Sequence, residues 1–182
     1  MSKKENNHKQ LRSKIDEEDV KQYVIDRFKD IKKSKKIKDL VKFQTMNKYM
    51  IMVHDQEELK IMGKLVASHK KKELSEIIKE YEMHLKLALK SNPTVKKHIN
   101  VLIHIFGYFL KNLNQYEKEK CFEMLKEFRE EKTELGEILA EMNPIIFRFD
   151  KTYLANQTYF LLYSTLQHEL SYNLLNIKIS KI

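Results

Sequence analysis

Apolar residues recur every three or four positions along most of the chain, which is the spacing of one side of an α-helix. A clear example is the stripe from Leu74 through Ile78 and Leu85 to Leu89. No run of alternating apolar and polar residues is long enough to indicate a β-strand or a β-hairpin. The pattern therefore predicts an all-α protein, a single helical bundle of about eight helices.

Capping residues mark where these helices begin. Acidic residues at positions 16–19 indicate the start of the first helix, because carboxylates are favoured at helix N-termini. A second helix is predicted over about 37–53. Asp55 and Asn114, each followed three residues later by Glu, are predicted helix caps. Asn92-Pro93 predicts a cap residue followed by proline at the first helical position.

The last third of the chain is divided by one proline and one aspartate. Pro144 is expected to stop or kink its helix, and Asp150 to cap the next one, which continues to about Leu162. A short terminal helix is predicted near 166–175. The whole chain is divided as follows: 1–14, a disordered basic tail; 15–38, an N-terminal helix and basic junction; 39–182, the main helical domain.

Composition limits the class of protein. An apolar fraction of 42%, with only three Gly and two Pro, favours a packed helical core over disorder. Cys121 is the single cysteine, so no intrachain disulfide and no cysteine-ligated cluster can form, and a free thiol fits a reducing cytosol. The N-terminus lacks the apolar core of a signal peptide, and no apolar run approaches the roughly 18 residues of a membrane span. We therefore expect a soluble, cytoplasmic protein that does not associate with a membrane.

The positive charge is concentrated in the first half of the chain. The formal net charge is +9, and residues 1–50 hold 15 Lys or Arg against 8 Asp or Glu, whereas residues 101–150 hold 7 against 10. This asymmetry favours a surface that faces an anionic partner. The alternative interpretation is that the excess lysine only solvates the surface.

The segment 94–111 contains the candidate site. On a helical projection its apolar residues gather around Leu102, and the opposite side carries a polar stripe without any acidic residue. Lysines can neutralise phosphates, an amide and an imidazole one turn apart can bond a base edge or ribose hydroxyl, and a tyrosine can stack on a base. The alternative is that these side chains cap other helices or face solvent. The stripe consists of Lys96, Lys97, Asn100, His104, Gly107, Tyr108 and Lys111.

No catalytic or metal centre is predicted. His98 falls on the apolar side, where we expect a core histidine hydrogen-bonded to a carbonyl. The other histidines are scattered, and neither a Gly-rich phosphate loop nor a Gly-x-Ser-x-Gly turn occurs, so we expect no metal and no cofactor. The aromatic series Tyr153, Tyr159, Phe160 and Tyr163 is interpreted as packing and not as a stacking platform.

Several short motifs resemble the YbgA-like family, a domain of unknown function, over about residues 39 to 163. The most specific is Lys97-His98-x-Asn100-Val-Leu-x-His104-x-x-Gly107-Tyr108-Phe109; supporting motifs are Leu40-Val-Lys-Phe-Gln, Asn47-Lys48-Tyr49, Met52-Val-His54, Met62-Gly-Lys-Leu-Val, Glu117-Lys118, Phe128-Arg129 and Tyr153-Leu154-x-x-Gln157-x-Tyr159. The family occurs alone or fused to an iron–sulfur domain resembling thiouracil desulfurases. In such fusions its members are thought to present thiolated tRNA to the cluster domain.

The residues and the resemblance together favour a non-catalytic nucleic-acid-binding accessory domain, with tRNA the preferred ligand, linked to thiolated-nucleobase metabolism. The expected contacts come from Lys96, Lys97, Asn100, His104, Tyr108 and Lys111, with Lys48 and Arg129 added by resemblance. Because Cys121 alone cannot hold a cluster, the resemblance implies a separate iron–sulfur desulfurase-like protein as a candidate partner.

Two other hypotheses remain open from the sequence. The chain could be a protein-interaction module that docks a separate desulfurase or repair enzyme, through the acidic stretch from Glu117 to Glu141. It could also be an enzyme that uses Asn100, His104 and Tyr108 as acid–base and orienting groups.

Overall fold

The computed structural model describes residues 16–164, and within this range it is all-α, with no strand. This confirms the predicted fold class. Ten α-helices and two short 3₁₀ helices follow one another in residues 16–164: α1 (Glu17–Ser34), α2 (Ile37–Met46), α3 (Lys48–His54), α4 (Gln56–Ala67), η1 (Ser68–Lys70), α5 (Leu74–Leu89), α6 (Val95–Phe106), η2 (Leu110–Asn112), α7 (Gln115–Arg129), α8 (Leu135–Arg148), α9 (Thr152–Ala155) and α10 (Thr158–Tyr163). None of these helices is long and apolar enough to cross a membrane. The predicted tail 1–14 and terminal helix 166–175 lie outside the described residues.

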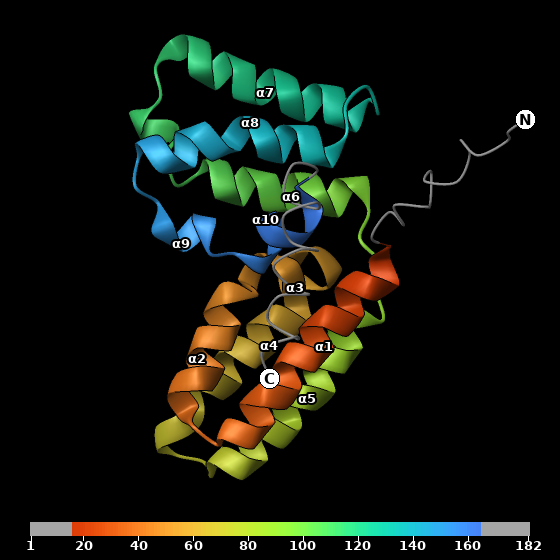
Figure 1. The fold of residues 1–182 in the computed structure, drawn as a ribbon, viewed down its shortest axis with the longest axis vertical. Helices are drawn as coiled ribbons and strands as arrows, with labels where there is room; N and C mark the ends of the chain where they lie inside the picture. The colour runs from red at the N-terminus through yellow and green to blue at the C-terminus, as the bar shows by residue number, and fades with distance from the viewer. Residues whose placement is uncertain (1–15, 165–182) are drawn as a thin grey trace, which may run out of the picture.

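The helices form two halves of an elongated bundle (Figure 1). The first half holds α1, α2, α4 and α5, and its core contains a stack of Phe28 on Tyr81 with ring centroids 5.3 Å apart. The second half holds α6, α7, α8 and α9, with α6 packed against α7. Helices α3 and α10 contact each other where the halves meet, so they join the two cores.

Side-chain caps mark the starts of several helices, including α1, α4, α6 and α7. Asp16 and Asp19 form a reciprocal capping box at α1, and Asn114 and Glu117 form another at α7. Asp55 accepts from two backbone amides at the start of α4. The predicted caps at Asp55 and Asn114 are therefore confirmed. Asn92 does not cap α6, because Thr94 does so by accepting from the Lys97 amide at 3.3 Å.

The helix predicted over 37–53 is broken into α2 and α3 at Asn47. The buried Asn47 amide donates to the Phe43 carbonyl at 2.9 Å, which closes α2. The Gln157 amide reaches the same point, donating to the Thr45 carbonyl at 2.8 Å and accepting from the Tyr49 amide at 3.4 Å. These bonds replace helical hydrogen bonds at the break, and the helix can change direction there.

The last third also differs from the prediction, at two turns. Helix α8 continues through Pro144 to Arg148, so the proline does not end its helix. Asp150 does not cap the next helix: it adopts a left-handed conformation with φ of 47° and ends α8, with its amide donating to the Phe147 carbonyl. Lys151 precedes α9, and the single helix predicted from Asp150 to Leu162 is two short helices separated at Asn156 and Gln157.

Candidate nucleic-acid interface

Helix α6 buries one side and exposes the other, as its helical projection indicates. Leu102 and Ile105 are fully buried, while the side chains on the opposite stripe reach solvent. One residue was not predicted there: Ile103 is 52% exposed, between the polar positions. The exposed positions are Lys96, Ile103, His104, Gly107, Tyr108 and Lys111, with Asn100 partly exposed.

Lys97 does not share this exposure. Its ammonium donates to the His54 carbonyl at 2.6 Å, to the Ser91 hydroxyl at 2.5 Å and to the Asn92 carbonyl at 3.4 Å. A lysine has three donors, so this set uses all of them. Lys97 therefore ties the start of α6 to the end of α3 and to the loop after α5, which is a structural role.

Asn100 also makes an internal contact. Its amide nitrogen donates to the Gln56 side-chain oxygen, 2.9 Å away at the start of α4. His104 and Tyr108 lie on the following turns of the same stripe and are exposed. The structure thus brings His104 and Tyr108 together on an accessible surface, while Asn100 is engaged with α4.

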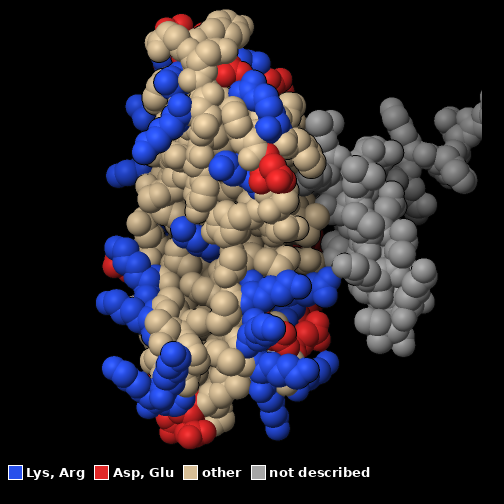
Figure 2. Space-filling view, turned by 90° about the vertical axis from the view of Figure 1, so that its left-hand side faces the viewer, with Lys and Arg blue, Asp and Glu red and all other residues tan. Residues whose placement is uncertain are grey.

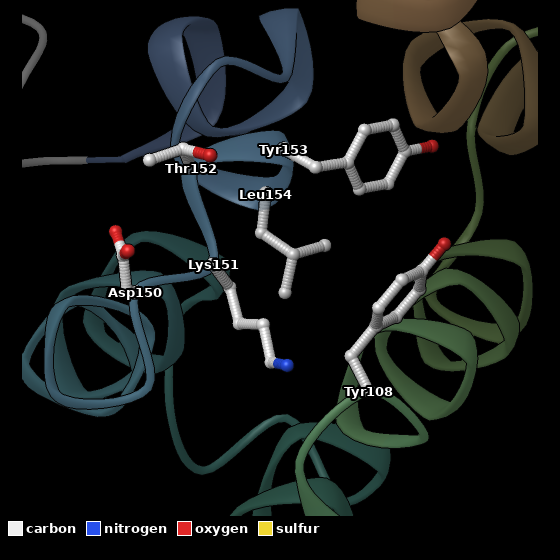
Figure 3. A pocket seen from close by; sticks show the side chains of 6 residues that line it. All are labelled: Tyr108, Asp150, Lys151, Thr152, Tyr153 and Leu154. Atoms are coloured by element: carbon white, nitrogen blue, oxygen red, sulfur yellow. The ribbon is translucent and has the colours of Figure 1, made fainter.

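Tyr108 forms one wall of a cavity of about 330 Å³. Its ring lies at a tilt of 31° to that of Tyr153, with centroids 5.6 Å apart. Figure 3 shows the two rings, Leu154 and the Lys151 ammonium directed toward a common space, with Asp150 and Thr152 on the side away from the tyrosines. Sequence reasoning assigned Tyr153 to packing and missed Lys151. The only feature of the sequence that points to Lys151 is its position in the turn after α8, two residues before Tyr153.

Lys48 and Arg129 occupy different parts of the structure. The Lys48 ammonium lies 5.4 Å from the ring centroid of Tyr49, whose side chain is buried next to the Tyr108 hydroxyl. Arg129 is exposed at the end of α7, following Phe128, whose ring packs edge-on against His98 near the start of α6. Lys48 therefore belongs to the neighbourhood of Tyr108, and Arg129 to the opposite end of α6.

The candidate cations are among the many surface lysines and arginines that have no carboxylate partner in the described part of the chain, whereas others are paired. On α1 and α7, Lys21 pairs with Glu18 at 2.6 Å and Lys120 with Glu141 at 2.7 Å. Within residues 16–164, none of the following takes part in an ion pair with a carboxylate: Lys48, Lys96, Lys111, Arg129 and Lys151. Their charges are left for a partner or for solvent.

Basic side chains are spread over the side of the molecule that carries α2 and α9 (Figure 2). They are densest over the lower half of that view, and acidic side chains are confined to a few places. Lys38 and Lys42 of α2 are exposed and belong to the basic first half of the sequence. Such a distribution attracts a polyanion over a broad area, because uncompensated charges of one sign add their potentials.

A second polar cluster is buried where α1, α3, α6 and α10 meet. His98 Nδ1 lies 2.8 Å from the Tyr159 hydroxyl oxygen, so its partner is a hydroxyl and not the predicted carbonyl. Burial, opposed in part by the Glu17 carboxylate, lowers the pKa of His98 from 6.5 to about 4. The Tyr163 hydroxyl donates to the Glu17 carboxylate at 2.9 Å. The imidazole of His98 is therefore neutral and structural at physiological pH.

His54 belongs to the same cluster. It is fully buried, and its Nδ1 donates to the Ser91 carbonyl at 2.7 Å. Its Nε2 lies 3.2 Å from a Glu17 carboxylate oxygen, although not in hydrogen-bond geometry. Through Glu17, the N-terminal helix α1 is attached to the rest of the bundle. Within the part of the chain that the structure describes, no group of three or more His, Cys, Asp or Glu side chains could hold a metal ion.

These features define an all-α protein with an exposed, basic, tyrosine-containing surface on α6 and the turn that follows it. A family model described as "Protein of unknown function (DUF1722)" matches residues 48–164, and the chain belongs to this family. It is similar to the "Uncharacterized protein YbgA" of Escherichia coli (strain K12), with 23% identity over 125 residues, covering 68% of this chain and 74% of that protein. The resemblance inferred from the motifs is thereby confirmed. No solved structure matches the chain.

Proposed function

We propose that this protein is a non-catalytic RNA-binding accessory domain, with tRNA the favoured ligand, and that it acts in thiolated-nucleobase metabolism. The observation that supports this proposal is the set of unpaired cations around the exposed side of α6. Lys96 and Lys111 stand at the two ends of the stripe and lack carboxylate partners in residues 16–164. Between them lie the exposed side chains of His104 and Tyr108.

The roles of the stripe residues follow from their contacts. Lys96 and Lys111 would neutralise phosphates, releasing the counterions that an RNA strand holds. His104 would bond a base edge or a ribose hydroxyl, and Tyr108 would stack on a base. Lys97 and Asn100 would position α6, because their polar groups are already bonded within the chain. Lys48 and Arg129 would add long-range attraction.

The test is a filter-binding titration with bulk tRNA across a series of salt concentrations. We expect binding that weakens steeply as salt rises. A Lys96→Gln/Lys111→Gln variant should bind more weakly, and the slope of log K against log salt should fall by about 0.7 for each phosphate that the variant no longer neutralises.

A matched control removes two exposed lysines that are already paired. Lys29 lies 2.7 Å from Asp26, and Lys60 lies 2.7 Å from Glu57. A Lys29→Gln/Lys60→Gln variant has the same net charge as the test variant and should bind as tightly as the parent protein. Equal losses of affinity in both variants would show that only net charge matters, and would contradict the assignment of RNA binding to Lys96 and Lys111.

A second candidate function is docking of a protein partner on α7 and α8. Three aromatic side chains are strongly exposed there: Tyr116 and Phe147 at 74% and Phe122 at 59%. Exposed aromatic residues are enriched at protein-interaction surfaces. Purification of the protein with a stoichiometric protein partner and without nucleic acid would favour this function. The enzyme hypothesis has less support, since the cavity beside Tyr108 is lined by neither Asn100 nor His104.

A further inference from the structure

The cavity beside Tyr108 is lined by aromatic, aliphatic and charged side chains. We name it the tyrosine pocket and define it by Tyr108, Asp150, Lys151, Thr152, Tyr153 and Leu154. The ring of Tyr108, 40% exposed, and the ring of Tyr153 form one side (Figure 3). Leu154 projects between them and the backbone of α9, and the Lys151 ammonium extends toward Tyr108. A flat apolar wall and a cation therefore face the same space.

The tyrosine pocket also has a polar end. Tyr49 is fully buried, and burial followed by its closeness to the Tyr108 hydroxyl raises the pKa of its phenol. The Tyr49 hydroxyl is closed off from solvent, and Tyr49 is not among the residues that line the pocket. It lies behind the hydroxyl of Tyr108, which is also close to that of Tyr153, so the hydroxyls of Tyr108 and Tyr153 form the polar end of the pocket.

These walls limit what the tyrosine pocket can hold. The occupant must present a flat face to Tyr108, hydrogen-bonding groups to the tyrosine hydroxyls, and negative charge to Lys151. A nucleotide has all three, because its base stacks on aromatic rings, its base edge is polar and its phosphate is anionic. The volume of about 330 Å³ is at the lower end of small-molecule sites, which suits one nucleotide.

We propose that the tyrosine pocket receives a single unpaired nucleotide of an RNA strand, with its base stacked on Tyr108 and its phosphate beside Lys151. The base edge would bond the tyrosine hydroxyls, and the phosphate would lie at the Lys151 ammonium, on the side away from the Asp150 carboxylate, which repels it. This inference rests on the proposed RNA-binding function and adds to it a preference for single-stranded or extruded nucleotides. Lys96 of α6 and Lys111 of η2 would hold the flanking strand, and the pocket would hold one nucleotide.

The experiment compares four full-length proteins: the parent, Tyr108→Leu, Tyr108→Phe and Tyr116→Leu. Tyr116→Leu is the control, because this tyrosine is 74% exposed on α7, outside the pocket. Each protein is titrated with a single-stranded oligoribonucleotide containing 5-bromouridine and with the same sequence as a duplex. Irradiated complexes are digested and the cross-linked residue is located by mass spectrometry. A circular dichroism melt confirms that each variant is folded.

The proposal predicts that the parent binds the single strand more tightly than the duplex and cross-links at Tyr108 or Tyr153. Tyr108→Leu should lose about 10-fold in affinity for the single strand, Tyr108→Phe should lose less, and Tyr116→Leu should lose nothing. Retained affinity in Tyr108→Leu, with cross-links elsewhere, would overturn the pocket assignment and leave RNA binding by α6 intact. Absence of RNA binding by the parent would overturn both proposals.

Discussion

The Gln157 amide donates a 2.8 Å hydrogen bond to the carbonyl of Thr45, a residue 112 positions earlier in the chain. The same side chain accepts from the Tyr49 amide, so it satisfies both sides of the break between α2 and α3. Gln157 is 1% exposed. The direction of α3, and with it the place of Tyr49 behind the tyrosine pocket, thus depends on one glutamine from the last third of the chain.

Replacement of this glutamine should destabilise the fold. Gln157→Leu removes the hydrogen bonds to the Thr45 carbonyl and from the buried Tyr49 amide, which should lower the free energy of unfolding by about 2–3 kcal/mol. Urea denaturation followed by circular dichroism measures the change. The neighbouring Asn156 is exposed, and Asn156→Ala should change stability little. If both variants unfold at the same urea concentration, Gln157 does not maintain the break.

The neutral state of His98 predicts an acid dependence of stability. Burial lowers its pKa from 6.5 to about 4 in the folded protein, so in this interval the unfolded chain binds a proton that the folded chain does not. Stability should therefore fall as pH decreases from about 6.5 to about 4, with a contribution from His98 of up to about 3 kcal/mol. Urea midpoints measured across this interval give the slope.

The His98→Gln variant should show a shallower decrease than the parent over the same interval, because glutamine cannot take up the proton. The matched control is His104→Gln, since His104 is an exposed histidine on the same helix. That control should keep the parental slope. A parental slope in His98→Gln would mean that other groups account for the acid dependence.

Two adjacent lysines should show opposite behaviour. Lys97→Met removes the donors to the His54 carbonyl and the Ser91 hydroxyl, and should lower the free energy of unfolding by about 2 kcal/mol. Lys96→Met should leave stability nearly unchanged but weaken tRNA binding at low salt. Thermal melts and filter binding are measured on both variants. Loss of tRNA affinity in a folded Lys97→Met protein, with none in Lys96→Met, would reverse the assignment of roles.

The periodic spacing of apolar residues was enough to predict an all-α bundle and the exposed side of α6, because both follow from local helix geometry. The inward turn of Lys97 could not be predicted, since its partner at His54 lies 43 residues away in sequence. The break at Asn47 depends in the same way on Gln157. The tyrosine pocket depends on the left-handed conformation of Asp150 after α8, which turns the chain so that Lys151 and Tyr153 lie near Tyr108. No local sequence pattern predicts that turn.

The attachment of α1 has a practical consequence for any attempt to isolate the family-related part of this protein. The region shared with the family begins at Lys48, yet Phe28 covers Tyr81 and Glu17 bonds Tyr163 from the preceding helix. A fragment cut at the family boundary would leave aromatic surfaces uncovered at both places, and we expect it to aggregate. The evolutionary module is thus smaller than the cooperative unit, and expression should begin no later than Asp16, the residue that caps α1.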